Sequence, residues 1–141
     1  MDKQRFYVDT KGDDDEAYKQ AMQFGCKFAD SYPEIKRVVL LINHSQDTGR
    51  FERLYGTNIV NGLVTGANFK GCKPLFKFET LKTYVDNHEN SDLVITCGLD
   101  SDEVSMIDDF HSVKVIVAIP WLPNRMEKWV KTWNPKQIRV N

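Results

Sequence analysis

The chain has 141 residues, a formal net charge of −1, and hydrophobic, aromatic and charged shares of 41%, 11% and 28%. This balance is typical of a folded globular domain and excludes intrinsic disorder, which needs fewer aromatic residues and a larger net charge. No uninterrupted apolar run exceeds the five residues of 38–42, far short of the roughly 18 residues of a membrane span. The near-zero net charge argues against nucleic acid as a partner.

The N-terminal half alternates short apolar runs with amphipathic stretches. A strand is predicted over residues 5–8, followed by a helix over about 14–32 with apolar residues at three- and four-residue spacing. Residues 36–42 form an apolar run without alternation, which is typical of a strand covered on both faces. A short helix over about 48–55 follows, and residues 58–65 are predicted to form a third strand.

The C-terminal half continues the alternation. The predicted elements are an edge strand at 74–78, a helix at 80–88, a strand at 92–97, a helix opening at 99–102, a strand at 113–119, a helix at 125–133 and a terminal strand at 137–140. Strands that alternate with helices indicate right-handed crossovers. The sequence therefore predicts one Rossmann-like α/β domain over residues 1–141, with three layers and a mainly parallel sheet of about five to six strands.

Candidate ligand-binding residues follow from this architecture, because open parallel sheets bind ligands beyond the carboxyl ends of their strands. In the loop after the second strand, Ser45, Thr48 and Gly49 offer backbone N–H groups to a phosphate or carboxylate, and Arg50 adds charge. The alternative is that these residues only cap a helix. Trp121, after the strongest strand, would stack on a planar ligand, cover the sheet end or meet another subunit. Neither a P-loop nor a dinucleotide glycine fingerprint occurs, so no cofactor is indicated.

A catalytic alternative depends on His44, at the end of a predicted central strand. Its imidazole would act as general acid or base, with Asp9 or Asp100 as the acidic partner. The competing interpretation is a hydrogen bond from His44 to a neighbouring backbone group. Asp47 and Asp102 lie on the same predicted edge of the sheet as Asp9 and Asp100, and the four would hold a magnesium ion or share acid/base work if the strand order brings them together. Acids before helices are commonly caps, so capping is the preferred interpretation and no metal ligands are assigned.

The three cysteines, Cys26, Cys72 and Cys97, are too few and odd in number to indicate a disulfide framework, and they contain no Cys-x-x-Cys pair for structural zinc. Together with an N-terminus that shows no secretory signal, this predicts a cytoplasmic protein. Cys97 precedes a predicted helix, whose N-terminus would lower a thiol pKa. Two nearby acids oppose a thiolate, and an inert, buried thiol is the preferred interpretation.

The predicted last helix carries an apolar stripe of Met126, Trp129, Val130 and Trp133. Such a stripe is usually core, but a terminal helix is also a common dimer face, so a homodimer through this helix is retained as an alternative. Lysines interleaved with phenylalanines over residues 69–78 are explained by a lysine-guarded edge strand rather than by a nucleic-acid surface.

The function that the sequence favours is a small-ligand-binding domain with a binding or regulatory role. Its predicted ligand is a nucleotide or another phosphorylated metabolite at the strand ends. Two alternatives remain open: a small hydrolase or transferase using His44, and a protein–protein interaction module using the C-terminal aromatic helix.

Overall fold

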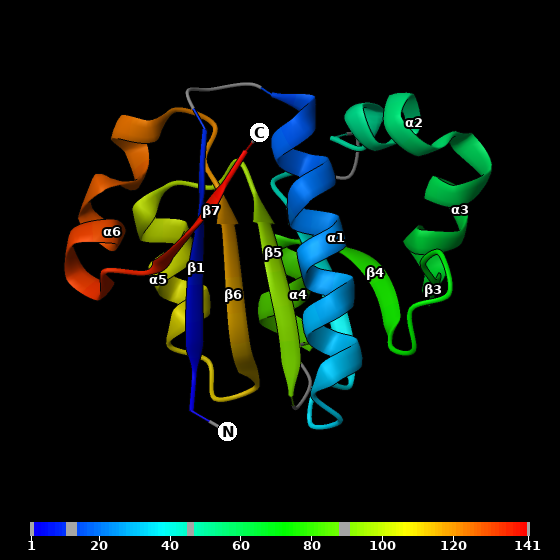
Figure 1. Ribbon diagram of the computed structural model, residues 1–141, viewed down its shortest axis with the longest axis horizontal. Helices are drawn as coiled ribbons and strands as arrows, with labels where there is room; N and C mark the ends of the chain where they lie inside the picture. The colour runs from blue at the N-terminus through cyan, green and yellow to red at the C-terminus, as the bar shows by residue number, and fades with distance from the viewer. Residues whose placement is uncertain (1, 11–13, 45–46, 88–90, 141) are drawn as a thin grey trace.

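The computed structural model describes residues 2–10, 14–44, 47–87 and 91–140, and a seven-stranded sheet lies at its centre (Figure 1). The strand order is β3-β4-β2-β5-β6-β1-β7. The strands are β1 (Gln4–Asp9), β2 (Arg37–Ile42), β3 (Ala67–Asn68), β4 (Leu75–Thr80), β5 (Asp92–Cys97), β6 (Val113–Ile119) and β7 (Lys136–Arg139). All neighbouring pairs are parallel except β3 with β4. The predicted three-layer α/β fold is confirmed, and the two-residue β3 adds a seventh strand.

Helices cover both faces of the sheet, which explains the uninterrupted apolar runs of its central strands. One face packs against α1 (Asp15–Ser31), α2 (Gly49–Tyr55) and α3 (Thr57–Thr65), and the other against α4 (Leu81–Asn87), α5 (Ser101–Asp108) and α6 (Glu127–Trp133). Along β2, Val38 and Leu40 join the first core and Val39 and Leu41 the second, as the alternation of side chains in a strand requires. No helix in the described ranges has the length and apolar character to cross a membrane.

The strand predicted at residues 58–65 is wrong, because this segment forms helix α3. Its buried side chains, Val60 and Leu63, are three positions apart, whereas Ile59 and Val64 are exposed. A strand would point Val60 and Leu63 to opposite faces, but a helix places both on one face. That face packs toward β4, so tertiary burial overrides the strand preference of the β-branched residues.

The chain changes direction across the sheet between β2 and β5. From β2 it proceeds through α2 and α3 to β4, on one side, and from β5 it proceeds through α5 to β6, on the other. β2 and β5 are neighbours in parallel register, with Arg37 opposite Asp92 and Leu41 opposite Thr96. A crevice between strands whose connections diverge in this way is the usual ligand position in open α/β sheets.

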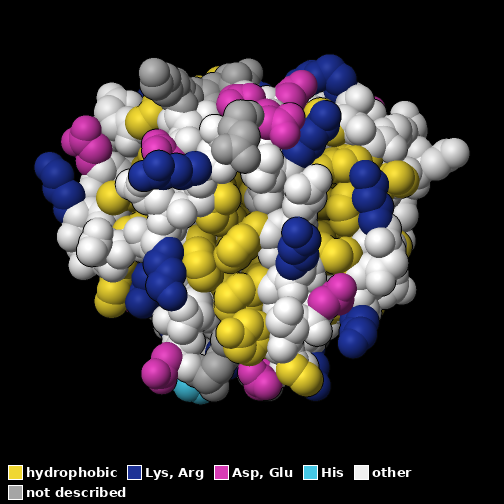
Figure 2. All heavy atoms as spheres, viewed as in Figure 1, with side chains coloured by type: hydrophobic (Ala, Val, Ile, Leu, Met, Phe, Trp, Pro, Cys, Tyr) yellow, Lys and Arg dark blue, Asp and Glu magenta, His cyan; other side chains and the backbone are white. Residues whose placement is uncertain are grey.

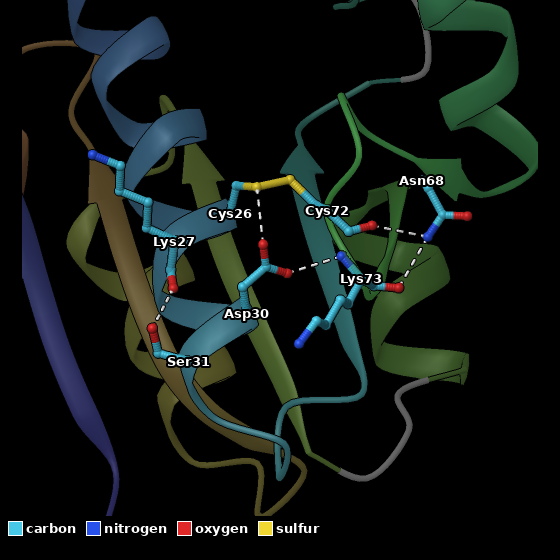
Figure 3. Close-up of a disulfide and its surroundings, with 7 residues drawn as sticks. All are labelled: Cys26, Lys27, Asp30, Ser31, Asn68, Cys72 and Lys73. Carbon is cyan, nitrogen blue, oxygen red and sulfur yellow. Dashed lines mark hydrogen bonds between the residues drawn. A yellow bond between two sulfur atoms is a disulfide. The ribbon is translucent and has the colours of Figure 1, made fainter.

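A disulfide joins Cys26 of α1 to Cys72 of the loop between β3 and β4, with the two Cα atoms 5.7 Å apart (Figure 3). This corrects the interpretation that the cysteines are unpaired. The two residues are 46 positions apart in the chain, so only the packing of α1 beside this loop brings them together.

Apolar side chains also gather on the surface along α1, on the side that faces β1 (Figure 2). Phe24 and Phe28 of α1 contact Phe6 of β1, with ring centroids 4.6 and 5.7 Å apart, and Tyr32 stacks on Phe28 at 4.5 Å. These aromatic contacts attach α1 to the β1 side of the sheet.

Candidate functional site

A cavity of about 460 Å³ opens at the carboxyl ends of β2 and β5. Ile42 and Asn43 form its wall at the end of β2, and Cys97, Gly98 and Leu99 form its wall at the end of β5. Residues of the loop after β6, of the N-terminal half of α1 and of the first turns of α2 and α5 complete it. The cavity therefore occupies the crevice that the strand order selects.

Several of the residues selected from the sequence line this cavity, namely Gly49, Arg50, Trp121 and Asp100. Other candidates do not contribute to the described lining. His44 is exposed in the turn after β2, Asp9 is exposed at the end of β1, and Thr48 directly precedes α2. Ser45 lies outside the described residues. The structure thus brings together the candidate binding residues Gly49, Arg50 and Trp121 around one cavity, and Asp100, but not His44, shares that lining.

Arg50 supplies a partly buried positive charge to the cavity. Its guanidinium carbon lies 4.2 Å from the centre of the Tyr18 ring, a cation–π arrangement, and its Nε lies 3.6 Å from an Asp15 carboxylate oxygen. Burial, and then the charge of Arg53, lower the pKa of Arg50 from its ordinary value. An arginine still stays protonated, so a desolvated guanidinium faces the cavity and an incoming anion would stabilise it.

Arg125 contributes a second guanidinium from η1 (Pro123–Met126), the short 3-10 helix that leads into α6. The residue is exposed, and within the described ranges its side chain forms no ion pair or hydrogen bond. Two arginines therefore reach one cavity, Arg50 from α2, which follows β2, and Arg125 from η1, which follows β6.

Trp121 gives the cavity a large aromatic surface. The residue is 51% exposed and lies against Gly98, where an added Cβ would stand 3.6 Å from the Trp121 Cβ and 3.8 Å from the Tyr18 hydroxyl oxygen. Gly98 also has a φ of +76°, which side chains rarely adopt. The positive φ, rather than the space around the residue, therefore favours glycine at the end of β5.

The acidic residues of the cavity are engaged with backbone N–H groups. Asp100 accepts from the Glu103 N–H at 2.9 Å and Glu103 from the Asp100 N–H at 3.0 Å, which forms a capping box at the start of α5. Asp47 accepts from the His44 N–H at 3.1 Å. These hydrogen bonds fix the loops around the cavity, whose lining holds the carboxylates of Asp47, Asp100 and Glu103 beside the guanidinium groups of Arg50 and Arg125.

Cys97 lines the cavity as an unpaired cysteine, and burial raises the pKa of its thiol despite the opposing effect of Arg50.

Because the pKa of the Cys97 thiol is raised, we expect iodoacetamide to alkylate Cys97 slowly at pH 7–8 in the folded protein and faster in the urea-unfolded chain. Mass spectrometry of the modified peptide measures this. Because the folded state holds the proton more tightly, Cys97 also makes folding less favourable as pH rises above about 8.5. Rapid alkylation of the folded protein at neutral pH would show a reactive thiolate instead.

The aromatic residues considered for partner binding lie mainly in the core. Trp129 is fully buried, whereas Trp133 is 44% exposed with the Arg5 guanidinium carbon 3.6 Å from its ring centre. The phenylalanines interleaved with lysines, Phe69, Phe76 and Phe78, are buried beneath the β4 edge and present no rings for stacking on bases.

Sequence reasoning missed Tyr18 and Arg125. Tyr18 is one of the apolar-face residues of α1, and nothing in its pattern distinguishes it from core. Arg125 had a usable signal, because it follows the same strand as Trp121 and the strand-end rule applies to both. The chain matches no protein-family model, and no curated protein or solved structure matches it at a significant level.

Proposed function

We propose that this cavity binds a small phosphorylated ligand with a planar group, of which a nucleotide is the best-fitting class. The observation that carries the proposal is the convergence of Arg50, Arg125 and Trp121 on one cavity between β2 and β5. Two guanidinium groups suit a phosphate, because each presents a planar set of N–H donors that matches phosphate oxygens. The Trp121 ring suits a base or another flat group.

The size and position of the cavity support the same function. Its volume of about 460 Å³ lies within the range of about 300–1,000 Å³ that is typical of small-molecule sites. Loops positioned by central, fully buried strands form its walls. The proposal does not depend on the N-terminus of α2, since that helix has only seven residues and Thr48 makes no side-chain cap.

A thermal-shift screen against nucleotides, sugar phosphates and inorganic phosphate tests the proposal. A ligand at about 100 times its dissociation constant adds roughly 2.7 kcal/mol of stability, which raises the melting midpoint by several degrees. We expect a nucleotide to produce this shift, and Arg50→Gln and Arg125→Gln each to reduce it strongly. Arg139→Gln removes an exposed arginine from β7 and is the matched control.

His44→Ala separates this proposal from the catalytic alternative. Because His44 does not line the described cavity, its replacement should leave the ligand-induced shift unchanged. A shift that survives both arginine substitutions, or no shift with any phosphorylated compound, would contradict the proposed function. Turnover of a bound compound that disappears in His44→Ala would favour the hydrolase or transferase.

A further inference from the structure

We propose that Cys26, Asp30 and Cys72 form a zinc site that becomes able to bind the metal when the Cys26–Cys72 disulfide is reduced. One ligand atom from each residue, the two sulfurs and a carboxylate oxygen, lies within 4.8 Å of the others. The cluster joins α1 to the loop between β3 and β4 (Figure 3). Its first residue, Cys26, lies eight positions further along α1 than the cavity residue Tyr18. The proposal is therefore independent of ligand binding in the cavity.

Two of the ligands share one face of α1. Cys26 and Asp30 are four positions apart in the helix, and the Asp30 carboxylate points toward the sulfur of Cys26, with Oδ2 and Sγ 3.9 Å apart (Figure 3). The other carboxylate oxygen, Oδ1, accepts a hydrogen bond from the Lys73 N–H at 2.8 Å. When one oxygen of a carboxylate ligates a metal, a hydrogen bond to the other oxygen commonly holds the carboxylate in its orientation.

The loop that carries Cys72 is held in place by contacts other than the disulfide. The Asn68 amide donates to the backbone oxygens of Cys72 and Lys73 at 3.0 and 2.9 Å, and the Cys72 N–H donates to the Phe69 oxygen at 2.9 Å. Phe69 is buried, with its ring centre 5.0 Å from that of Tyr55. Reduction of the disulfide therefore leaves the three ligands gathered.

The donor set selects the metal. Two thiolates favour Zn²⁺ over hard cations such as Mg²⁺ and Ca²⁺, and one carboxylate with a water molecule completes a tetrahedral shell. Zinc–sulfur bonds of about 2.3 Å place the two sulfurs roughly 3.8 Å apart in such a shell. The two sulfurs are bonded to each other in the oxidised protein, so they have to move apart to reach this separation once the disulfide is reduced.

A dithiol can reduce the Cys26–Cys72 disulfide, after which Zn²⁺ binds the two sulfurs. The dithiol transfers two electrons and two protons to the Cys26–Cys72 bond, which yields two thiols, and becomes a disulfide itself. Zn²⁺ then binds the two sulfurs and Asp30 and releases the two thiol protons to water. The oxidised protein has no thiolates at this site, so the disulfide and the metal exclude each other.

The experiment compares zinc binding by the full-length protein before and after treatment with a dithiol, which is removed before titration. A chromophoric chelator reports Zn²⁺ affinity and stoichiometry, and Co²⁺ substitution reports sulfur ligation through its charge-transfer absorption. We expect one equivalent bound by the reduced protein and none by the oxidised protein. Cys97→Ser, which removes the remaining cysteine, should bind like the parent chain.

Variants distinguish a metal site from a purely structural disulfide. Asp30→Asn keeps the disulfide and an acceptor for the Lys73 N–H, yet should weaken zinc binding of the reduced protein by at least about tenfold. Cys26→Ser and Cys72→Ser should abolish it, with circular dichroism verifying that each variant is folded. If the reduced, folded protein binds no stoichiometric zinc, or if binding survives in either serine variant or is unchanged in Asp30→Asn, the proposal is overturned.

Discussion

Replacing Arg37 with methionine should destabilise the protein by about 3–5 kcal/mol, because it leaves the Asp92 carboxylate charged and buried. Asp92 is fully buried at the start of β5 and accepts from Arg37 Nε and Nη2 at 3.3 and 3.1 Å. The Tyr84 hydroxyl also donates to Asp92, at 2.7 Å, and burial together with this carboxylate raises the Tyr84 pKa, so the hydroxyl keeps its proton. Urea denaturation followed by circular dichroism measures the loss.

A double variant tests the cause of this loss. If the buried carboxylate without its cationic partner is responsible, Arg37→Met/Asp92→Asn should be more stable than Arg37→Met by about 0.5–3 kcal/mol, the usual coupling between contacting residues. Arg139→Met makes the same change at an exposed site of β7 and should alter stability by less than about 0.5 kcal/mol. An Arg37→Met variant as stable as Arg139→Met would show that the ion pair contributes no net stability.

The second large effect is expected at Trp129. Its side chain is fully buried in the core between the sheet and α5 and α6, and its Nε1–H donates to an Asp108 oxygen at 2.9 Å. Truncation in Trp129→Ala should cost about 3–5 kcal/mol through the cavity that it creates. Trp129→Phe keeps an aromatic ring but removes a donor to a charged group, so its expected cost is about 1.5–3 kcal/mol.

Trp133 provides the comparison for Trp129. It lies four positions further along the same helix, is 44% exposed, and contacts Arg5 through its ring face. Trp133→Ala should cost about 1–2 kcal/mol, because it removes a cation–π contact near the surface and the apolar surface of only a half-buried ring. Equal losses in Trp129→Ala and Trp133→Ala, measured by the same urea denaturation, would mean that burial does not govern the stability of this helix.

The sequence predicted the sheet well because its central strands are apolar on both faces. The runs at β2, β5 and β6 leave little ambiguity, since their length and β-branched content suit buried parallel strands. The segment of α3 was mispredicted because Ile59, Val60 and Val64 favour strands locally, whereas the buried pair Val60 and Leu63 fits only a helix. Packing, which the local sequence does not encode, decides such short segments.

The candidate site was predicted in part for a similar reason. The strand-end rule locates loops, so Arg50 and Trp121 were found, but which loops meet depends on strand order. Tyr18 reaches the cavity from α1 on one face of the sheet, a position that no spacing in the sequence reveals. The Cys26–Cys72 pair has the same origin, because contact across 46 residues arises only from tertiary packing.

The ion pair of Arg37 and Asp92 lies at the first residues of β2 and β5, and the cavity lies at their last residues, Ile42 and Cys97. A six-residue strand places these two ends about 17 Å apart. Side chains beyond the strand ends therefore can be exchanged with little effect on the network that secures the sheet. This separation leaves the fold open to sequence change: the loops around the cavity can vary at one edge of the sheet while the buried ion pair is retained at the opposite edge.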